Sequence, residues 1–173
     1  MNVSIKSNRL RIRHFEATDI EDFVGFMIDP DSTKFLTFDQ AQKSREGAEE
    51  LLRFTIDSYA SESPLMAFAI EDRTSGKLVG FCGLTPREDG DVEIMYATLE
   101  SFRGNGYAVE TASTLAQYAI EELGFSRVIA PISMEHGVSK AVAVKAGFQN
   151  SGIYKSPDSS REVNIYVYVQ PQN

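Results

Sequence analysis

Hydrophobic residues recur at helical spacing in one stretch of the second half of the chain. Beginning at Ala108, they occupy positions i, i+4, i+7, i+8, i+11, i+12 and i+15, the pattern of a helix with one buried face: Ala108, Ala112, Leu115, Ala116, Ala119, Ile120 and Leu123. Gly124 follows, where a left-handed glycine commonly ends a helix. Residues 92–97 read as a strand. We therefore predict a strand, a glycine-rich turn and a buried helix in succession over residues 92–124.

The N-terminal part predicts a strand followed by two helices. Residues 9–15 alternate between polar and apolar side chains, as in a half-buried strand. Thr18 and Glu21 have the spacing of a capping box for a helix that ends at Asp29-Pro30. A second helix is expected from about Ser44. The polar segment between these helices is predicted to be a loop, whose apolar residues either fill the core or line a substrate entrance: Phe35, Leu36 and Phe38.

The rest of the chain is predicted to be mostly strands. We expect strands at residues 66–71, 77–84, 92–98, 127–132, 148–154 and 162–169, a short helix at 138–146 ended by Gly147, and a loop at 155–160. The first three strands have short connections and should form an antiparallel meander. Pro131 has no N–H group, so strand pairing should be broken on one side there. Cys82 in the middle strand is expected to be a small buried hydrophobe rather than a nucleophile.

The turn before the central helix has the composition of an anion-binding site. The first N–H groups of a helix lack partners within the helix and lie at the positive end of its dipole. Gly104 and Gly106 leave the backbone open to phosphate oxygens. The Walker pattern is absent, and the dinucleotide-binding fingerprint fails at Val109. On its own, the turn indicates either a phosphate cradle or simply a tight connection.

Two sequence blocks resemble a known family. Residues 103–108, Arg-Gly-Asn-Gly-Tyr-Ala, match the Arg/Gln-x-x-Gly-x-Gly/Ala signature of the GNAT acetyl-CoA N-acetyltransferase superfamily. The extension to Glu110 resembles its RimJ/RimL-type branch of ribosomal-protein N-terminal acetyltransferases. Residues 138–148 are similar to that branch's closing Ser-x-x-Val-x-x-Lys-x-Gly-Phe. The segment 9–19 is also typical of it, so the resemblance covers nearly the whole chain.

The resemblance implies a single domain over residues 1–173 with the mixed α/β GNAT fold, in which helices flank a central, mostly antiparallel, splayed sheet. In that fold the strand before the cradle and the strand after the central helix diverge, and the pantetheine arm of coenzyme A lies in the gap. Backbone N–H groups of residues 104–108 should matter more than the Arg103 side chain. The residues implied to bind acetyl-CoA are Ala97, Thr98, Arg103, Gly104, Asn105, Gly106, Tyr107, Ala108, His136 and Ser139.

Glu93 is the candidate general base. Alkyl amines are protonated at neutral pH, so a proton must leave before the amine can attack a thioester. Glu93 alternates with Met95 and Ala97, which would place its carboxylate on a largely apolar strand face, where burial raises a carboxyl pKa. By resemblance, many family members carry an acidic base on this strand. The alternative is an exposed or ion-paired carboxylate near a turn.

Ser139 stands where the RimJ/RimL-type motif has its serine, and the resemblance implies that it donates a hydrogen bond to the coenzyme sulfur or the departing thiolate. The alternative is a polar residue in the first turn of a helix. Two positions depart from the family. His136 replaces the usual asparagine, and it is either a hydrogen-bond donor, a titrating group or simply a loop residue. Ala143 replaces the tyrosine that is the acid in many members. Substitutes for that acid are Tyr96, Tyr107 and Tyr154, although core packing is favoured for each.

Composition is that of an ordinary globular protein. The 173 residues are 42% hydrophobic and 24% charged, and one cysteine and two histidines argue against a disulfide framework or a structural zinc site. No apolar run is long enough to span a membrane and no signal-peptide pattern is present, so a cytoplasmic location is expected. The net charge of −8 argues against broad nucleic-acid binding and mildly favours a cationic acceptor.

The sequence therefore predicts an acetyl-CoA-dependent N-acetyltransferase that transfers the acetyl group directly, in a ternary complex, to a primary amine. No metal is expected, because the thioester is already activated. A protein N-terminal α-amine is the favoured acceptor, and a small polyamine or amino-sugar is the alternative. Other hypotheses are a catalytically weak coenzyme-A-binding regulatory domain and a nucleotide-phosphate-binding domain. A monomer or a homodimer is expected.

Overall fold

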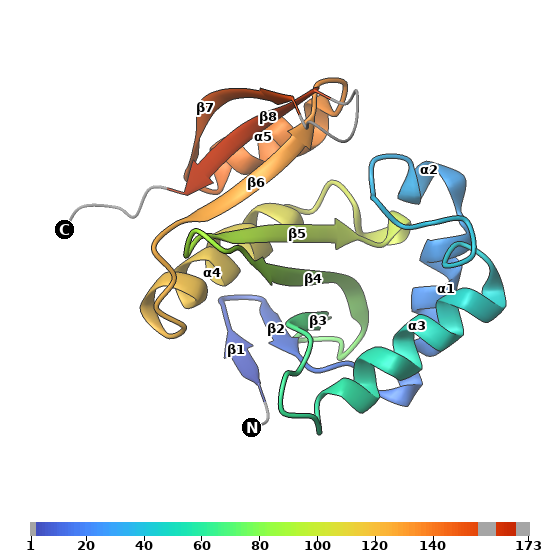
Figure 1. The fold of residues 1–173 in the computed structure, drawn as a ribbon. Helices are drawn as coiled ribbons and strands as arrows, with labels where there is room; N and C mark the ends of the chain where they lie inside the picture. Colours follow the sequence, from blue (N-terminus) through green and yellow to red (C-terminus); the bar gives the residue numbers. More distant parts are fainter. Residues whose placement is uncertain (1–2, 156–161, 169–173) are drawn as a thin grey trace. The chain divides into compact units, whose positions relative to one another are not determined.

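The computed structural model describes residues 3–155 and 162–168, and it follows the predicted order of elements closely (Figure 1). The predicted loop residues 156–160 and the predicted strand end at Val169 lie outside the described residues. The elements are β1 (Ser4–Lys6), β2 (Leu10–Arg13), η1 (Ala17–Asp19, a 3-10 turn), α1 (Ile20–Ile28), α2 (Pro30–Thr33), α3 (Arg45–Ser58), β3 (Ala67–Asp72), β4 (Leu78–Pro86), β5 (Val92–Thr98), η2 (Glu100–Phe102), α4 (Tyr107–Glu121), β6 (Val128–Ser133), α5 (Gly137–Lys145), β7 (Phe148–Lys155) and β8 (Glu162–Tyr168).

The fold is mixed α/β, as predicted, with helices flanking an eight-stranded, mostly antiparallel sheet of strand order β1-β2-β3-β4-β5-β6-β8-β7. Strands β3, β4 and β5 are neighbours in chain order, which confirms the predicted meander. By its internal contacts the chain divides into two compact units. The first runs through Cys82 and includes Ala97–Tyr107, and the second comprises Gly83–Tyr96 and the part from Ala108 onward. The assignment of residues 1–173 to one domain stays a prediction.

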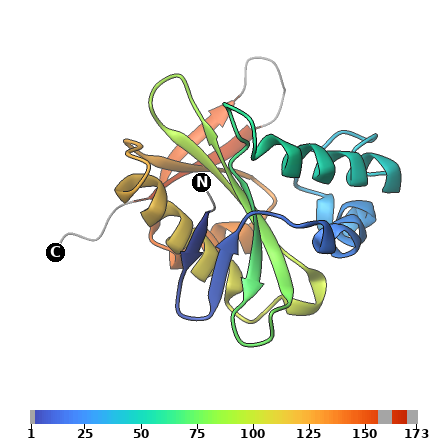
Figure 2. The same cartoon turned by 90° about the horizontal axis from the view of Figure 1, so that it is seen from below.

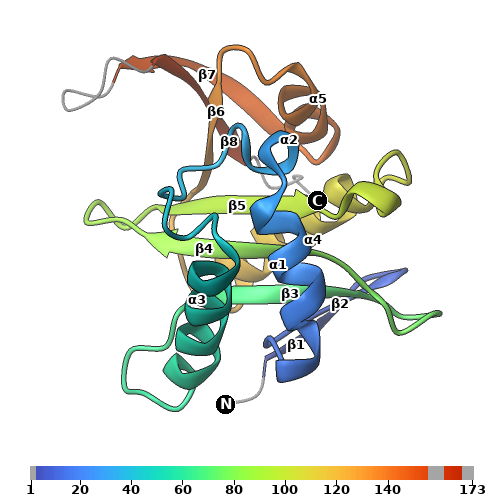
Figure 3. The same cartoon turned by 90° about the vertical axis from the view of Figure 1, so that its right-hand side faces the viewer.

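The first unit is built on β1, β2 and β3, which pair antiparallel (Figure 2). Strand β1 was not predicted, because three residues are too few to show a period. Helices α1 and α3 lie side by side (Figure 3). Their unit has an aromatic core in which Phe26 of α1 meets Phe81 of β4 edge-on, with ring centroids 4.7 Å apart, and Phe15 and Phe23 pack around them.

The start of α1 differs from the prediction, since Thr18 and Glu21 do not form a capping box. The chain first makes the turn η1, in which the Glu16 N–H donates to the Asp19 carboxylate at 2.8 Å. The physical reason is that Arg13 binds both Asp19 oxygens, at 2.8 and 3.0 Å, and so holds that side chain toward β2. Helix α1 therefore begins at Ile20, one residue later than the Thr18 capping pattern suggests, and its N-cap is Asp19.

The segment predicted as a loop over residues 29–44 contains the short helix α2. Its N-cap is Asp29, whose carboxylate accepts hydrogen bonds from the N–H groups of Asp31 and Ser32. Pro30 occupies the first helical position, where its missing N–H group carries no cost. The apolar residues of this segment are half-buried, and their place in the core or at a substrate entrance stays a prediction: Phe35, Leu36 and Phe38.

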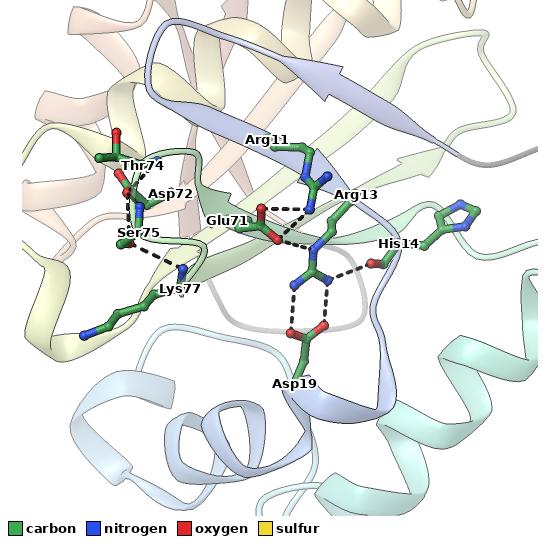
Figure 4. A network of polar contacts seen from close by, with 9 residues as sticks. All are labelled: Arg11, Arg13, His14, Asp19, Glu71, Asp72, Thr74, Ser75 and Lys77. Carbon is green, nitrogen blue, oxygen red and sulfur yellow. Dashed lines mark hydrogen bonds and ion pairs between the residues drawn. The ribbon is translucent and has the colours of Figure 1, made fainter.

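A network of ion pairs crosses the first unit between β2, β3 and η1 (Figure 4). The Arg13 side chain is only 11% exposed, although the alternating pattern predicted a half-buried strand with outward polar residues. It pairs with Asp19 and with Glu71, each at 2.8 Å, and Arg11 also binds Glu71. Burial alone would raise the pKa of the Glu71 carboxyl, but Arg11 and Arg13 together hold it below its ordinary value.

In the second unit, most of the central helix α4 buries the predicted face. Ala112, Leu115, Ala116 and Ala119 are fully buried, whereas Leu123 is 39% exposed because α4 ends at Glu121. Gly124 has a φ of +76° and ends this segment, as predicted. Strand β8 lies between β6 and β7, antiparallel to both, and α5 packs on β6 and β7 (Figure 1).

Candidate functional site

The glycine-rich turn before α4 has the geometry of an anion cradle. Gly104 and Gly106 have φ angles of +77° and +78°, which favour glycine. Within residues 3–155 and 162–168, nothing accepts a hydrogen bond from the N–H groups of Gly104, Asn105 or Gly106. A Cβ on Gly104 would enter open space. The turn thus presents unbonded donors at a helix N-terminus, and its shape fits a phosphate or pyrophosphate.

The Arg103 side chain is engaged with the first unit. Its Nη2 donates to the Ser32 Oγ of α2 at 2.7 Å, and its Nε donates to the Thr98 carbonyl at 3.3 Å. The Ser32 hydroxyl in turn donates to the Asp29 carboxylate, and this bond is the largest cause that holds the pKa of Asp29 below its ordinary value. Arg103 therefore connects the turn to α2, and its role in binding phosphate stays a prediction.

Two other side chains brace the turn from within the first unit. Asn105 Nδ2 donates to the carbonyls of Phe102 and Arg103, at 3.0 and 3.2 Å. Tyr107 donates its hydroxyl proton to Asp72 Oδ2 at 3.0 Å. The side chains of Asn105 and Tyr107 thus have structural partners within the protein. Their contacts with coenzyme, which the resemblance implies, stay predictions.

Arg9 also supports the turn, a role that no sequence pattern indicated. Its Nη1 donates to the Asn105 carbonyl at 2.8 Å, and its guanidinium lies 4.8 Å from the centre of the Tyr107 ring. Arg9 and Asn105 are 96 positions apart. No periodicity or local motif reports a contact over that separation.

Strands β5 and β6 are parallel but pair over only two positions, Val92 with Val128 and Glu93 with Ile129. Two further contacts hold the strands together where this pairing begins. The Val92 N–H donates to the Arg127 carbonyl, and the Arg127 guanidinium binds the buried Asp91 at 2.6 Å. Beyond Ile129, β6 pairs with β8 alone among the described residues, including at Pro131. This confirms both the predicted splay and the break in pairing near Pro131.

The two remaining predicted coenzyme contacts on β5 belong to the first unit. The Ala97 carbonyl lies so close to Gly80 of β4 that a Cβ on Gly80 would be 2.1 Å from it. The Thr98 carbonyl accepts the Arg103 bond described above. Gly80 is thus required for the approach of β4 to β5, and contacts of Ala97 and Thr98 with coenzyme stay predictions.

The Glu93 carboxylate is not buried on an apolar face. The prediction of such a face from the alternation of Glu93 with Met95 and Ala97 was therefore wrong. Its side chain is 37% exposed and forms an ion pair with Arg87 Nη1 at 2.5 Å. Arg87 also pairs with Asp89 at 3.4 Å, and it follows directly on the end of β4. The turn between β4 and β5 thus brings an arginine over the start of β5. The role of Glu93 as a base stays a prediction.

Ser139 lies in the first turn of α5 and meets Tyr96 of β5 inside the second unit. The two hydroxyl oxygens are 3.2 Å apart, and the Tyr96 hydroxyl is 3.3 Å from the Ser139 carbonyl oxygen. Burial raises the pKa of Tyr96 above its ordinary value. The sequence favoured core packing for Tyr96, whereas the structure places its hydroxyl beside the predicted serine.

The two departures from the family lie on the same helix as Ser139. His136 is the N-cap residue of α5 and is half-buried, and this burial lowers the pKa of its imidazole. Its side chain makes no capping hydrogen bond. Ala143 is fully buried, so the place of the usual tyrosine is taken by a core alanine.

Other chemical groups were also located. Cys82 is fully buried, as predicted, and burial raises the pKa of its thiol. Among the described residues no helix is long and apolar enough to cross a bilayer, and no group of three acidic, histidine or cysteine side chains is arranged to hold a metal ion. A cavity of about 390 Å³ lies by Arg11, Arg13 and Tyr59, and it includes none of the predicted site residues.

Comparison with known families decides the assignment, because a family model described as an acetyltransferase (GNAT) domain matches residues 9–149. The chain belongs to the GNAT acetyltransferase family. Members of this family take the acetyl group from acetyl-CoA, and this GNAT protein is accordingly an acetyl-CoA-dependent N-acetyltransferase. The resemblance inferred from residues 103–108 and 138–148 is confirmed.

Individual GNAT relatives match over nearly the full length. An N-acetyltransferase of Bacillus licheniformis named p20 is 23% identical over 171 residues, covering 96% of this chain and 93% of that protein. The structure of a GNAT-family acetyltransferase from Bacillus anthracis superposes with a TM-score of 0.78 at 24% identity, covering 96% of each chain. The structure of RimL, a ribosomal L7/L12 α-N-protein acetyltransferase, superposes with a TM-score of 0.78 at 18% identity, covering 98% of this chain and 96% of its own. These structures establish the fold.

Proposed function

We propose that this enzyme binds acetyl-CoA through the turn 103–108 and transfers the acetyl group directly to a primary amine, with a protein N-terminal α-amine as the favoured acceptor. The observation that carries the proposal is the turn itself. Two left-handed glycines expose unbonded N–H groups immediately before α4. These groups suit the pyrophosphate of the coenzyme, and the edge of β6 that no longer pairs with β5 beyond Ile129 suits its pantetheine amides.

In this proposal the chain supplies donors and a proton acceptor, and acetyl-CoA supplies the activated acyl group. Gly104 to Ala108 hold phosphate oxygens by their N–H groups. Ser139 donates a hydrogen bond to the departing sulfur, and the half-buried His136 contacts the pantetheine arm in place of the usual asparagine. No redox or metal step is needed for an acyl transfer from a thioester.

Glu93 takes the proton that the amine loses. Its carboxylate is exposed enough for a water molecule to lie between it and the amine, and Arg87 fixes one of its oxygens. The amine nitrogen forms a bond to the acetyl carbon, the C–S bond breaks, and the sulfur leaves with that electron pair. The products are the acetylated amine and free coenzyme A.

An α-amine suits this arrangement better than a polyamine. Its ordinary pKa is about 8, whereas that of an alkyl amine such as the lysine side chain is about 10.4. At pH 7 a larger fraction of an α-amine is therefore neutral. An exposed, ion-paired carboxylate then needs to remove a proton from a smaller fraction of the acceptor molecules before the attack. The full-length likeness to RimL, named for an α-N-protein acceptor, supports the same choice.

The acceptor is tested with a matched pair of peptides. One has a free N-terminus and the other is already acetylated there, and both contain one lysine; spermidine and an amino-sugar complete the panel. We expect thiol release from acetyl-CoA above the amine-free background only with the free N-terminus, and mass spectrometry should locate the new acetyl group on it. Faster turnover with spermidine or the amino-sugar would replace the α-amine by a small-molecule acceptor. Acetyl-CoA binding without turnover on any amine would indicate the coenzyme-binding regulatory domain.

A further inference from the structure

The geometry points to Tyr96 as a positioning residue for the acetyl transfer. We propose that its hydroxyl donates a hydrogen bond to Ser139 Oγ and thereby directs the Ser139 hydroxyl proton toward the departing sulfur of coenzyme A. This inference rests on the proposed function, since it assigns Tyr96 a task through Ser139. The proposal also gives a tyrosine a part in the reaction, although the family's usual tyrosine position is occupied here by the buried Ala143.

The contact joins two elements that are 43 positions apart in the sequence. Tyr96 is on β5, in the stretch that no longer pairs with β6, and Ser139 is in the first turn of α5. Their hydroxyl oxygens are 3.2 Å apart, and the Ser139 carbonyl oxygen is 3.3 Å from the tyrosine hydroxyl. Both residues are half-buried, so their contact is partly shielded from water.

The protons of the two hydroxyl groups can be counted. Tyr96 has one proton and two acceptors within reach, the carbonyl oxygen and Oγ of Ser139. If Tyr96 donates to Oγ, the serine proton is available to a third atom. If serine instead donates to tyrosine, its proton is used within the pair. A negative sulfur near Ser139 favours the first arrangement, because the serine proton then faces the new charge.

Tyr96 stays protonated throughout this step. A thiol has an ordinary pKa of about 8.5 and a phenol of about 10, so a thiolate is too weak a base to take the phenolic proton. Burial raises the pKa of Tyr96 further, which strengthens this conclusion. Its contribution is therefore a hydrogen bond to Ser139, and the thiolate leaves with the C–S electron pair and receives its proton from solvent.

The test is a double-mutant cycle with Tyr96→Phe and Ser139→Ala. Tyr96→Phe keeps the ring and should lower kcat about tenfold, as expected for about 1.4 kcal/mol of transition-state stabilisation, with the Kd for acetyl-CoA unchanged within about twofold. In the Ser139→Ala background, Tyr96→Phe should have no further effect, because its target hydroxyl is gone. Tyr168→Phe is the matched control, since Tyr168 is a buried tyrosine of the same unit that packs on Phe148, and this variant should leave kcat within about twofold.

Two results would overturn the inference while the wild-type enzyme turns over. One is an unchanged kcat for Tyr96→Phe, and the other is an equal loss from Tyr96→Phe with and without the Ser139 hydroxyl. Hydrolysis of acetyl-CoA without an amine, which expels the same thiolate, provides a second readout that does not depend on the acceptor. Failure of the proposed function is distinguishable, because the wild type would then release no thiol in either assay.

Discussion

The carboxylate of Glu93 has both a partner and access to water. Arg87 contacts one of its oxygens at 2.5 Å, and more than a third of the side chain is exposed. An ion pair at such a site contributes little to stability, because solvent screens both charges. Replacing this carboxylate should therefore affect the reaction far more than the fold.

Glu93→Gln should lower kcat by about a hundredfold, because a positioned general base contributes roughly that much to a proton transfer. The Kd for acetyl-CoA should stay within about twofold, since Glu93 lies apart in sequence from the turn 103–108. Steady-state thiol release and calorimetric binding measure the two quantities. Asp89→Asn is the control, because Asp89 pairs with the same Arg87 and should leave kcat nearly unchanged. A Glu93→Gln enzyme with wild-type kcat would remove Glu93 from the mechanism.

At the scale of elements, the turn before α4 combines a backbone requirement with the proposed binding of acetyl-CoA. Gly104 and Gly76 both have left-handed φ angles, +77° and +68°, and a Cβ on either would meet no atom. Alanine at each position therefore incurs a similar backbone strain, of about 1 kcal/mol. They differ in location, since Gly76 is in the turn between β3 and β4.

Gly104→Ala and Gly76→Ala should reduce the unfolding free energy by similar amounts, as measured by urea unfolding. Only Gly104→Ala should weaken acetyl-CoA binding, by about tenfold or more, because its methyl group would occupy the space of a phosphate oxygen. Equal affinities of the two variants for acetyl-CoA would contradict the assignment of the turn as the coenzyme cradle.

The sequence predicted the long elements and missed the short ones for a physical reason. Helices α1, α3 and α4 each show several turns of apolar periodicity, whereas β1 and α2 have three and four residues and show none. The predicted capping box of α1 was wrong because Arg13, in the preceding strand, binds the Asp19 carboxylate. The glycine-rich turn was predictable because it is a continuous motif. The contacts of Tyr96 with Ser139 and of Arg9 with Asn105 were not, because they join distant positions.

At the scale of the whole molecule, stability in acid depends on the ion-pair network of the first unit. The pKa of Glu71 in the folded protein lies below its ordinary value of 4.5, held there against burial by Arg11 and Arg13. A carboxyl group with a depressed folded pKa stabilises the protein above its unfolded pKa, and this contribution is lost as the pH falls through the folded pKa. The network should therefore stabilise the protein at neutral pH, and this stabilisation should be lost in acid as Glu71 is protonated.

Glu71→Gln should lower the unfolding free energy at pH 7 by about 3 kcal/mol, because it leaves the mostly buried Arg13 short of one partner. Urea unfolding across pH should show this deficit shrinking below about pH 4.5, where the wild type loses the same charge. Glu21→Gln is the control, since Glu21 is 76% exposed and should change stability by no more than about 0.5 kcal/mol. A deficit that is constant down to pH 3 would contradict the assigned role of Glu71.

The most direct test of the account is thermal unfolding with acetyl-CoA, with ADP and ATP as controls at equal concentration. Ligand at a hundred times its Kd should add about 2.7 kcal/mol and raise the Tm by about 5–10 °C for a chain of this size. The account predicts that shift for acetyl-CoA and a much smaller one for the nucleotides. No shift at saturating acetyl-CoA, or an equal shift with ADP, would contradict the assignment of residues 103–108 as the acetyl-CoA cradle.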